Sequence, residues 1–200
     1  MAQKVFGIGF HKTGTTSFGE ALKVLGYSVT GPNWIYHGNI GRTHLARCRA
    51  LSHDFDAFQD NPWPLVYREM DEMWPEAKFV LTVRDPHKWI SSQTKHFSRD
   101  TTPMRKFIYG ADKGHPSGNE EHYIATYERH NAAVRAYFKD RPDKLLELDF
   151  EQPVEWAALC AFLGKPEPQV AFPHANPAGT DRSISLRTKL RRKVRSLFSV

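Results

Sequence analysis

The chain has 200 residues, of which 40% are hydrophobic and 25% charged, and its formal net charge is +6. This composition is ordinary for a soluble globular protein, and no apolar run approaches the length that crosses a bilayer. The length predicts one domain over residues 1–180 and a basic tail over residues 181–200. The first strand begins close to Met1 without a signal-peptide pattern, so a cytoplasmic location is expected.

The positive charge is concentrated at the carboxyl end of the chain. Residues 182–200 contain seven Lys and Arg side chains and no acid, so the rest of the chain sums to about −1. Apolar residues alternate with these cations, which predicts an amphipathic tail suited to peripheral contact with an anionic membrane, to a polyanion or to a partner. A tail packed on its own domain is equally consistent. No recognition motif accompanies the charge, so no nucleic-acid partner is expected.

The cysteines and histidines show no metal-binding spacing. Cys48 and Cys160 lie in partly apolar segments that are predicted to be helical, and the ten histidines are scattered along the chain. The two cysteines are predicted to be reduced packing residues. No metal is expected.

Segments with the periods of strands and helices alternate along the chain. Strands are predicted over residues 4–9, 27–30, 56–59, 78–83 and 144–148. Helices are predicted over residues 17–25, 43–51, 62–73, 86–95, 120–138 and 154–163. Residues 99–119 show no clear period and are predicted to be a mobile loop or an active-site lid. This alternation predicts an α/β fold with a central parallel sheet flanked by helices, and ligands bind such sheets at the carboxyl ends of the strands.

The first predicted strand is followed by a glycine-containing loop and the start of a helix. Backbone N–H groups in such a loop point at one place, and the helix dipole adds positive charge there. Lys12 supplies a full charge, and the N–H groups and hydroxyls come from Thr13, Gly14, Thr15, Thr16 and Ser17. The loop therefore predicts a site for phosphate or sulfate. An alternative for its last residues is a capping box formed by Ser17 and Glu20.

This loop differs from the commonest nucleotide-binding loop. Gly9 and Gly14 have the spacing of a Walker A motif, but Thr15 occupies its lysine position and the lysine comes earlier, at Lys12. The displaced lysine argues against a small-molecule kinase that uses ATP, which stays open as an alternative.

A second cluster follows the strand over residues 78–83. Arg84 lies at the strand end, Asp85 and Pro86 begin the next helix, and Ser92 lies about two turns into it. Arg84 and Ser92 could bind one phosphate, since an arginine fork suits that group and a serine hydroxyl adds a donor. The alternative is a surface salt bridge between Arg84 and Asp85 beside an exposed serine.

These two clusters together resemble the sulfotransferase family, in particular its short bacterial-type branch. The similarity covers about residues 4–176 and departs at the end, where the glycine-rich basic loop of the cytosolic members has no clean match. The resemblance implies a three-layer P-loop-type fold and the donor 3′-phosphoadenosine 5′-phosphosulfate (PAPS). It also implies that the loop from His11 to Ser17 holds the 5′-phosphosulfate and that Arg84 and Ser92 hold the 3′-phosphate.

The resemblance implies sulfuryl transfer from PAPS to a hydroxyl or amine of a small-molecule or glycan acceptor. Lys12 is the candidate that stabilises the leaving phosphate. Asp60 occupies the position of the family's histidine and is the candidate base, with His11 and His96 in reserve. Asp60 could also cap the helix that Pro62 opens, and the two roles are compatible. The acceptor pocket is expected from residues 31–42 and 97–119. A non-catalytic polyanion or membrane binder acting through the tail is the remaining alternative.

Overall fold

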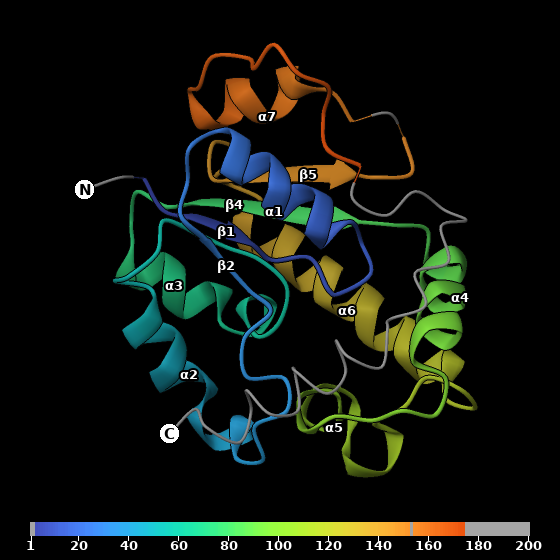
Figure 1. The fold of residues 1–200 in the computed structure, drawn as a ribbon. Helices are drawn as coiled ribbons and strands as arrows, with labels where there is room; N and C mark the ends of the chain where they lie inside the picture. Colours follow the sequence, from blue (N-terminus) through green and yellow to red (C-terminus); the bar gives the residue numbers. More distant parts are fainter. Residues whose placement is uncertain (1–2, 153, 175–200) are drawn as a thin grey trace, which may run out of the picture.

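The computed structural model, which describes residues 3–152 and 154–174, is a three-layer α/β fold with one parallel sheet at its centre (Figure 1). The strands lie in the order β2-β3-β1-β4-β5, and every pairing is parallel. They are β1 Val5–Gly7, β2 Val29–Thr30, β3 Ala57–Phe58, β4 Lys78–Val83 and β5 Leu145–Asp149. The predicted fold class and all five predicted strands are thus confirmed.

The helices form a layer on each face of the sheet and a group beyond its carboxyl edge. They are α1 Thr15–Val24, α2 Ile40–Leu51, α3 Tyr67–Met73, α4 Pro86–Phe97, α5 Pro103–Tyr109, α6 Glu120–Phe138 and α7 Trp156–Leu163. Helices α1 and α7 cover one face, and α2, α3 and α6 cover the other, while α4 and α5 lie beyond the sheet (Figure 1). None of the helices within the described residues is long and apolar enough to cross a membrane.

Two apolar cores sandwich the sheet because neighbouring residues of a strand point to opposite faces. In β1, Val5 joins the core beneath α1 and α7, and Phe6 joins the core above α3 and α6. The two cysteines, predicted to be packing residues, are free thiols buried one in each core. A third, aromatic cluster lies at the carboxyl edge and consists of Phe10, Trp89, Ile90, Tyr109, Tyr123 and Tyr127.

The helix predicted over residues 62–73 is divided. A short 3₁₀ turn, η1 Trp63–Leu65, comes first, and α3 begins only at Tyr67. No side chain caps the start of η1, and Asp60 adopts a left-handed φ of 62°. The prediction that Asp60 caps this helix is therefore wrong, and its carboxylate is used elsewhere.

Residues 99–119 are not an irregular loop. They contain α5 and a second 3₁₀ turn, η2 Ala111–Lys113. The hydroxyl of Thr102 caps α5 by accepting the N–H of Arg105, and Pro103 occupies the first helical turn. A threonine followed by proline is an ordinary helix start. The sequence did not indicate α5 because, at 7 residues, it is too short to show a helical period, and the lid role stays a prediction.

A buried ion cluster joins α3 to the segment before β5. Asp71 is 6% exposed; its Oδ2 accepts from Arg141 at 2.5 Å and from the Tyr137 hydroxyl at 3.0 Å, and Lys144 lies 3.1 Å from its Oδ1. Burial alone would raise the pKa of Asp71, but the hydrogen bonds from Arg141, Lys144 and Tyr137 outweigh it and hold the pKa below its usual value. The cluster therefore stabilises the folded chain while Asp71 is ionised.

The free energy of unfolding of an Asp71→Asn protein is expected to be about 3 kcal/mol lower than that of the parent at pH 7, because breaking a buried ion pair leaves a charge uncompensated. Because the folded pKa is depressed, this stabilisation is present above the unfolded pKa of Asp71 and disappears as pH falls through the folded pKa. Urea unfolding at several pH values measures it. The exposed Asp54→Asn is the control, and a difference that persists undiminished at low pH would contradict the expectation.

Candidate active site

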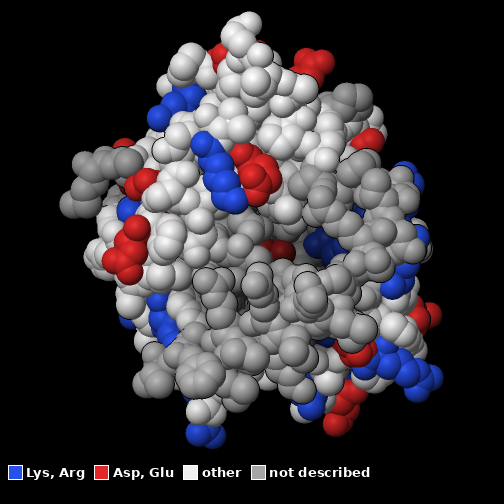
Figure 2. Space-filling model, in the orientation of Figure 1, with Lys and Arg blue, Asp and Glu red and all other residues white. Residues whose placement is uncertain are grey.

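Three of the predicted site residues follow three adjacent strands. Lys12 comes after β1, Asp60 after β3 and Arg84 after β4, and the sheet order β3-β1-β4 brings all three to one carboxyl edge. Arg84 and Asp60 both shift the pKa of Lys12, so the three groups lie within electrostatic reach. Figure 2 shows a hollow in the middle of this face with acidic and basic atoms at its floor. The edge predicted to bind the ligand is thus where the charged groups gather.

The N-terminus of α1 is open to an anion. Gly14 precedes the helix with a φ of 96°, no side chain caps the helix start, and the first turn holds no acid. Glycine is required there because a Cβ would lie 2.5 Å from the Phe150 ring, and because of the positive φ. The first N–H groups of a helix have no partner within it, and the dipole makes them favour negative charge. The alternative capping box is absent, since the helix begins before Ser17 and Glu20 pairs with Lys23 at 2.7 Å.

The threonines of this loop have different tasks. The Thr13 hydroxyl donates to the Phe10 carbonyl at 2.5 Å and lies 2.6 Å from the Thr82 hydroxyl on β4. It therefore fastens the loop to the sheet, and only the backbone N–H of Thr13 remains a candidate for the ligand. The Thr15 hydroxyl turns instead to Asp60, 2.9 Å away. Thr16 is exposed on the first turn of α1.

Hydrogen bonds fix the Asp60 carboxylate, and burial desolvates it. Its Oδ1 accepts the N–H of Asn61 at 2.7 Å, and its Oδ2 accepts from Thr15. Burial raises the pKa of Asp60, while the hydrogen bonds from Asn61 and Thr15 and the charge of Lys12 oppose that rise. A carboxylate with a raised pKa is a stronger proton acceptor than an exposed one.

Lys12 lies in a left-handed backbone conformation with a φ of 68°. Burial lowers the pKa of Lys12, the nearby charge of Arg84 lowers it further, and Asp60 opposes both. A half-buried cation beside another cation is stabilised by any anion that enters. The electrostatics of Lys12 therefore favour a bound phosphate or sulfate.

His11 does not have the properties of the reserve base. It is 6% exposed, its Nδ1 lies 2.9 Å from the Asn61 amide nitrogen, and its Nε2 lies 3.5 Å from the Tyr109 hydroxyl. Burial above all, and then the charges of Arg105 and Lys12, lower the pKa of His11 to about 3. At neutral pH the His11 ring stays uncharged, and its contacts with Asn61 and Tyr109 support the loop. His96, the other reserve, is exposed on α4.

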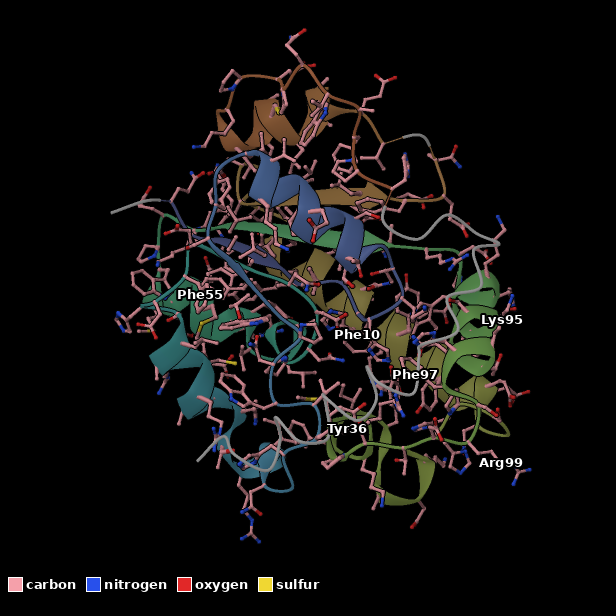
Figure 3. The ribbon with its side chains drawn as sticks, in the orientation of Figure 1. Phe10, Tyr36, Phe55, Lys95, Phe97 and Arg99 are labelled. Carbon is pink, nitrogen blue, oxygen red and sulfur yellow. The ribbon has the colours of Figure 1, made fainter. Side chains whose placement is uncertain are left out.

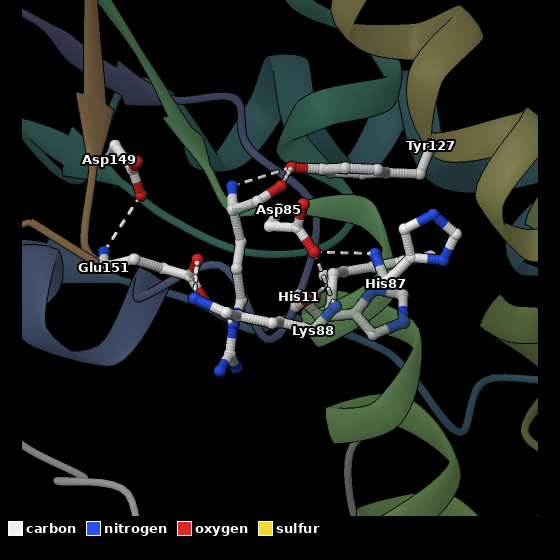
Figure 4. A network of polar contacts seen from close by, with 9 residues as sticks. His11, Asp85, His87, Lys88, Tyr127, Asp149 and Glu151 are labelled. Atoms are coloured by element: carbon white, nitrogen blue, oxygen red, sulfur yellow. Dashed lines mark hydrogen bonds and ion pairs between the residues drawn. The ribbon is translucent and has the colours of Figure 1, made fainter.

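Arg84 is held at its backbone and at its side chain (Figure 4). The Tyr127 hydroxyl donates to the Arg84 carbonyl and accepts its N–H, both at 2.9 Å. The Arg84 Nε donates to Glu151 at 2.9 Å, so the alternative pairing with Asp85 is not present. Asp85 caps α4 as predicted, accepting N–H groups of the first turn. Ser92 lies half-buried on α4, and its joint contact with Arg84 stays a prediction.

The two segments expected to form the acceptor pocket meet beside the loop. The Met104 N–H of α5 donates to the Ile35 carbonyl at 3.2 Å, and Tyr36 next to it is 56% exposed. The ring of Phe97 lies 5.8 Å from that of His11, and Figure 3 shows Phe97 and Tyr36 on the α5 side of the loop. Tyr36 is thus free to meet a ligand.

The structure adds residues that the sequence analysis did not assign. Asn61 and Tyr109 brace His11, Tyr127 fixes the Arg84 backbone, and Glu151 fixes the Arg84 side chain. The sequence could have indicated one of these residues. Glu151 follows β5, the strand beside β4, so the carboxyl-edge rule that selected Arg84 applies equally to it.

The fold is α/β, and at this edge a glycine-containing loop and a second cationic strand end form a candidate anion site. The family model for the sulfotransferase domain matches residues 4–113 and 97–180. The chain therefore belongs to the sulfotransferase family, as its sequence motifs predicted.

The chain is also similar to two individual proteins. Ava biosynthesis cluster protein M of Aspergillus versicolor is 27% identical over 145 residues, which cover 60% of this chain and 54% of that protein. The chain thus spans about half the length of this curated relative. A crystal structure of a sulfotransferase from Alicyclobacillus acidocaldarius covers 99% of this chain and 92% of its own, with a TM-score of 0.52 and 17% identity. At that identity the likeness concerns the fold alone.

Proposed function

We propose that this sulfotransferase moves a sulfuryl group from PAPS to a hydroxyl or amine of a small-molecule or glycan acceptor. The observation that carries the proposal is the convergence of the open α1 N-terminus, Lys12, Arg84 and a desolvated Asp60 at one edge of the sheet. Two cationic groups at neighbouring strand ends suit a donor with anions at both ends, and the carboxylate on the other side of Lys12 suits proton removal.

The donor set fits PAPS chemically. The N–H groups of the first turn of α1 and the Lys12 ammonium would hold the 5′-phosphosulfate, since helix N-termini and lysines both bind phosphate. Arg84 would hold the 3′-phosphate, with Ser92 as an added donor. The bound donor supplies the sulfuryl group and the leaving phosphate. The part of the chain that the structure describes contains no group of three or more side chains that could hold a metal ion.

The chain's own residues then have distinct tasks. The loop N–H groups and Lys12 stabilise negative charge as it develops on the leaving phosphate oxygen. Asp60 accepts the proton of the acceptor hydroxyl or amine as that atom attacks the sulfur. The loop and Arg84 fix the donor at both ends, so that acceptor, sulfur and leaving oxygen can align.

Incubation with ³⁵S-labelled PAPS and a panel of phenols, alcohols, amines and glycans tests the proposal. Labelled product and stoichiometric adenosine 3′,5′-bisphosphate (PAP) are expected without added magnesium. Failure to bind PAP, together with magnesium-dependent binding of ATP, would overturn the proposal in favour of the kinase. The tail at 181–200, on which the polyanion- or membrane-binding alternative depends, lies outside the described residues. A cytoplasmic location stays a prediction.

A further inference from the structure

Glu151 is an acidic residue inside a site that should bind an anion. One carboxylate oxygen accepts from Arg84 Nε at 2.9 Å, and the other accepts from Lys88 Nζ at 3.1 Å (Figure 4). The Glu151 side chain is 16% exposed, against 29% for Arg84 and 65% for Lys88. A carboxylate placed against the cation that should bind a phosphate requires a reason.

The position of Glu151 follows from the register of the sheet. Strands β4 and β5 are parallel, and Val83 pairs with Asp149, so the residues after each strand end side by side. The Asp149 carboxylate accepts the Glu151 N–H at 2.9 Å, which fixes the turn after β5. Glu151 is therefore delivered to Arg84 by the framework of the sheet.

The contact uses one particular atom of the guanidinium. The Glu151 oxygen accepts the Nε–H, and neither terminal nitrogen of Arg84 donates a hydrogen bond to Glu151. Those terminal nitrogens form a fork that matches two phosphate oxygens. Since Tyr127 already fixes the Arg84 backbone, a bond at Nε fixes the direction in which the fork points.

The charge of Glu151 is present at neutral pH. Its burial alone would raise the pKa, but the hydrogen bonds from Arg84 and Lys88 outweigh burial and hold the pKa of Glu151 below its usual value. The carboxylate therefore lowers the net positive charge of the site, which opposes anion binding. Its benefit must come from orientation, through lost rotamer freedom before the ligand arrives.

We infer that Glu151 is a positioning residue for the 3′-phosphate: it holds Arg84 by Nε so that the terminal nitrogens face that phosphate. This inference rests on the proposed function and assigns the discrimination between nucleotides with and without a 3′-phosphate to the Arg84–Glu151 pair. Glu151 itself does not touch the ligand.

Calorimetric titration with PAP and with adenosine 5′-monophosphate, which lacks the 3′-phosphate, tests the inference. Glu151→Ala is expected to weaken PAP binding about tenfold, because binding must then immobilise the freed Arg84 side chain, and to leave binding of the monophosphate unchanged. Glu151→Gln keeps an acceptor for Nε and removes the charge, so it should bind PAP at least as tightly as the parent. The matched control is Glu147→Ala on β5, which breaks the ion pair of Glu147 with Arg135 of α6.

Different results would overturn the proposed function and the inference about Glu151. A parent protein that binds PAP no better than the monophosphate would overturn the proposed function and this inference with it. A parent that prefers PAP while Glu151→Ala binds PAP equally or more tightly would overturn only the inference, because Glu151 would then be indifferent or a competitor. Equal losses for both ligands, or a Gln variant as weak as the Ala variant, would also overturn it.

Discussion

An Asp60→Asn protein is expected to lose about 10²–10⁴-fold in kcat for sulfuryl transfer while binding PAP as the parent does, because only the proton acceptor is removed. The carboxamide matches the carboxylate in size and still offers an oxygen to the Asn61 N–H. Steady-state kinetics with ³⁵S-labelled PAPS and PAP calorimetry measure the two quantities. A variant with unchanged kcat would exclude Asp60 as the base.

The pH dependence follows from the same carboxylate. Because burial raises the pKa of Asp60, kcat/KM should fall as pH drops through this raised pKa and the base becomes protonated. Thr15→Val removes a hydrogen bond to the charged form and should move the acid limb to higher pH, whereas Thr15→Ser should leave it in place. An acid limb that is identical in the Val and Ser variants would contradict the role of Thr15.

Stability should respond in the opposite sense to activity. A raised folded pKa means that Asp60 favours folding below its unfolded pKa and that this contribution is lost as pH rises through the folded pKa. The Asp60→Asn protein should therefore be at least as stable as the parent at pH 8. Thermal unfolding at that pH measures this, and a large loss of Tm would show that the carboxylate is structural.

Lys12→Ala is the second change with a large expected effect. Removing a cation that stabilises developing charge typically costs about 10²–10³-fold in kcat, and PAP affinity should fall at least about tenfold with the lost charged contact. The control is Lys23→Ala on α1, where the lysine is exposed and pairs with Glu20. Binding of PAP by the Lys12 variant as tightly as by the parent would reject the loop as the 5′-phosphosulfate site.

The strands and the site edge could be predicted because their signals are local. Residues 78–83 are a nearly continuous apolar run, and β4 occupies those residues. Lys12, Asp60 and Arg84 each follow a predicted strand, so a parallel sheet alone was enough to bring them to one edge. Helix α5 was not predicted. Its capping residue is visible in the sequence, but the helix is too short to show a helical period.

The hydrogen-bond partners at the site could not be predicted, since each joins residues far apart in the chain. Thr15 and Thr13 are two positions apart in one motif, yet one hydroxyl binds Asp60 and the other Thr82. Which way each points depends on the left-handed turn at Gly14 and on the strand beside it. The sequence predicted that the hydroxyls of this loop bind the ligand, whereas in the structure one of them bonds to Asp60 and the other to the sheet.

The sequence by itself determined the family, the parallel sheet and the two cationic clusters, because glycine spacing, strand ends and charge are written in consecutive residues. Only the tertiary structure decided that Asp60 is desolvated and held by Thr15, that His11 is neutral, and that Glu151 holds Arg84. Burial and hydrogen bonding are properties of neighbours in space. Burial and hydrogen bonding set the protonation states and orientations of these side chains, whereas the sequence could predict only that they lie at one edge of the sheet.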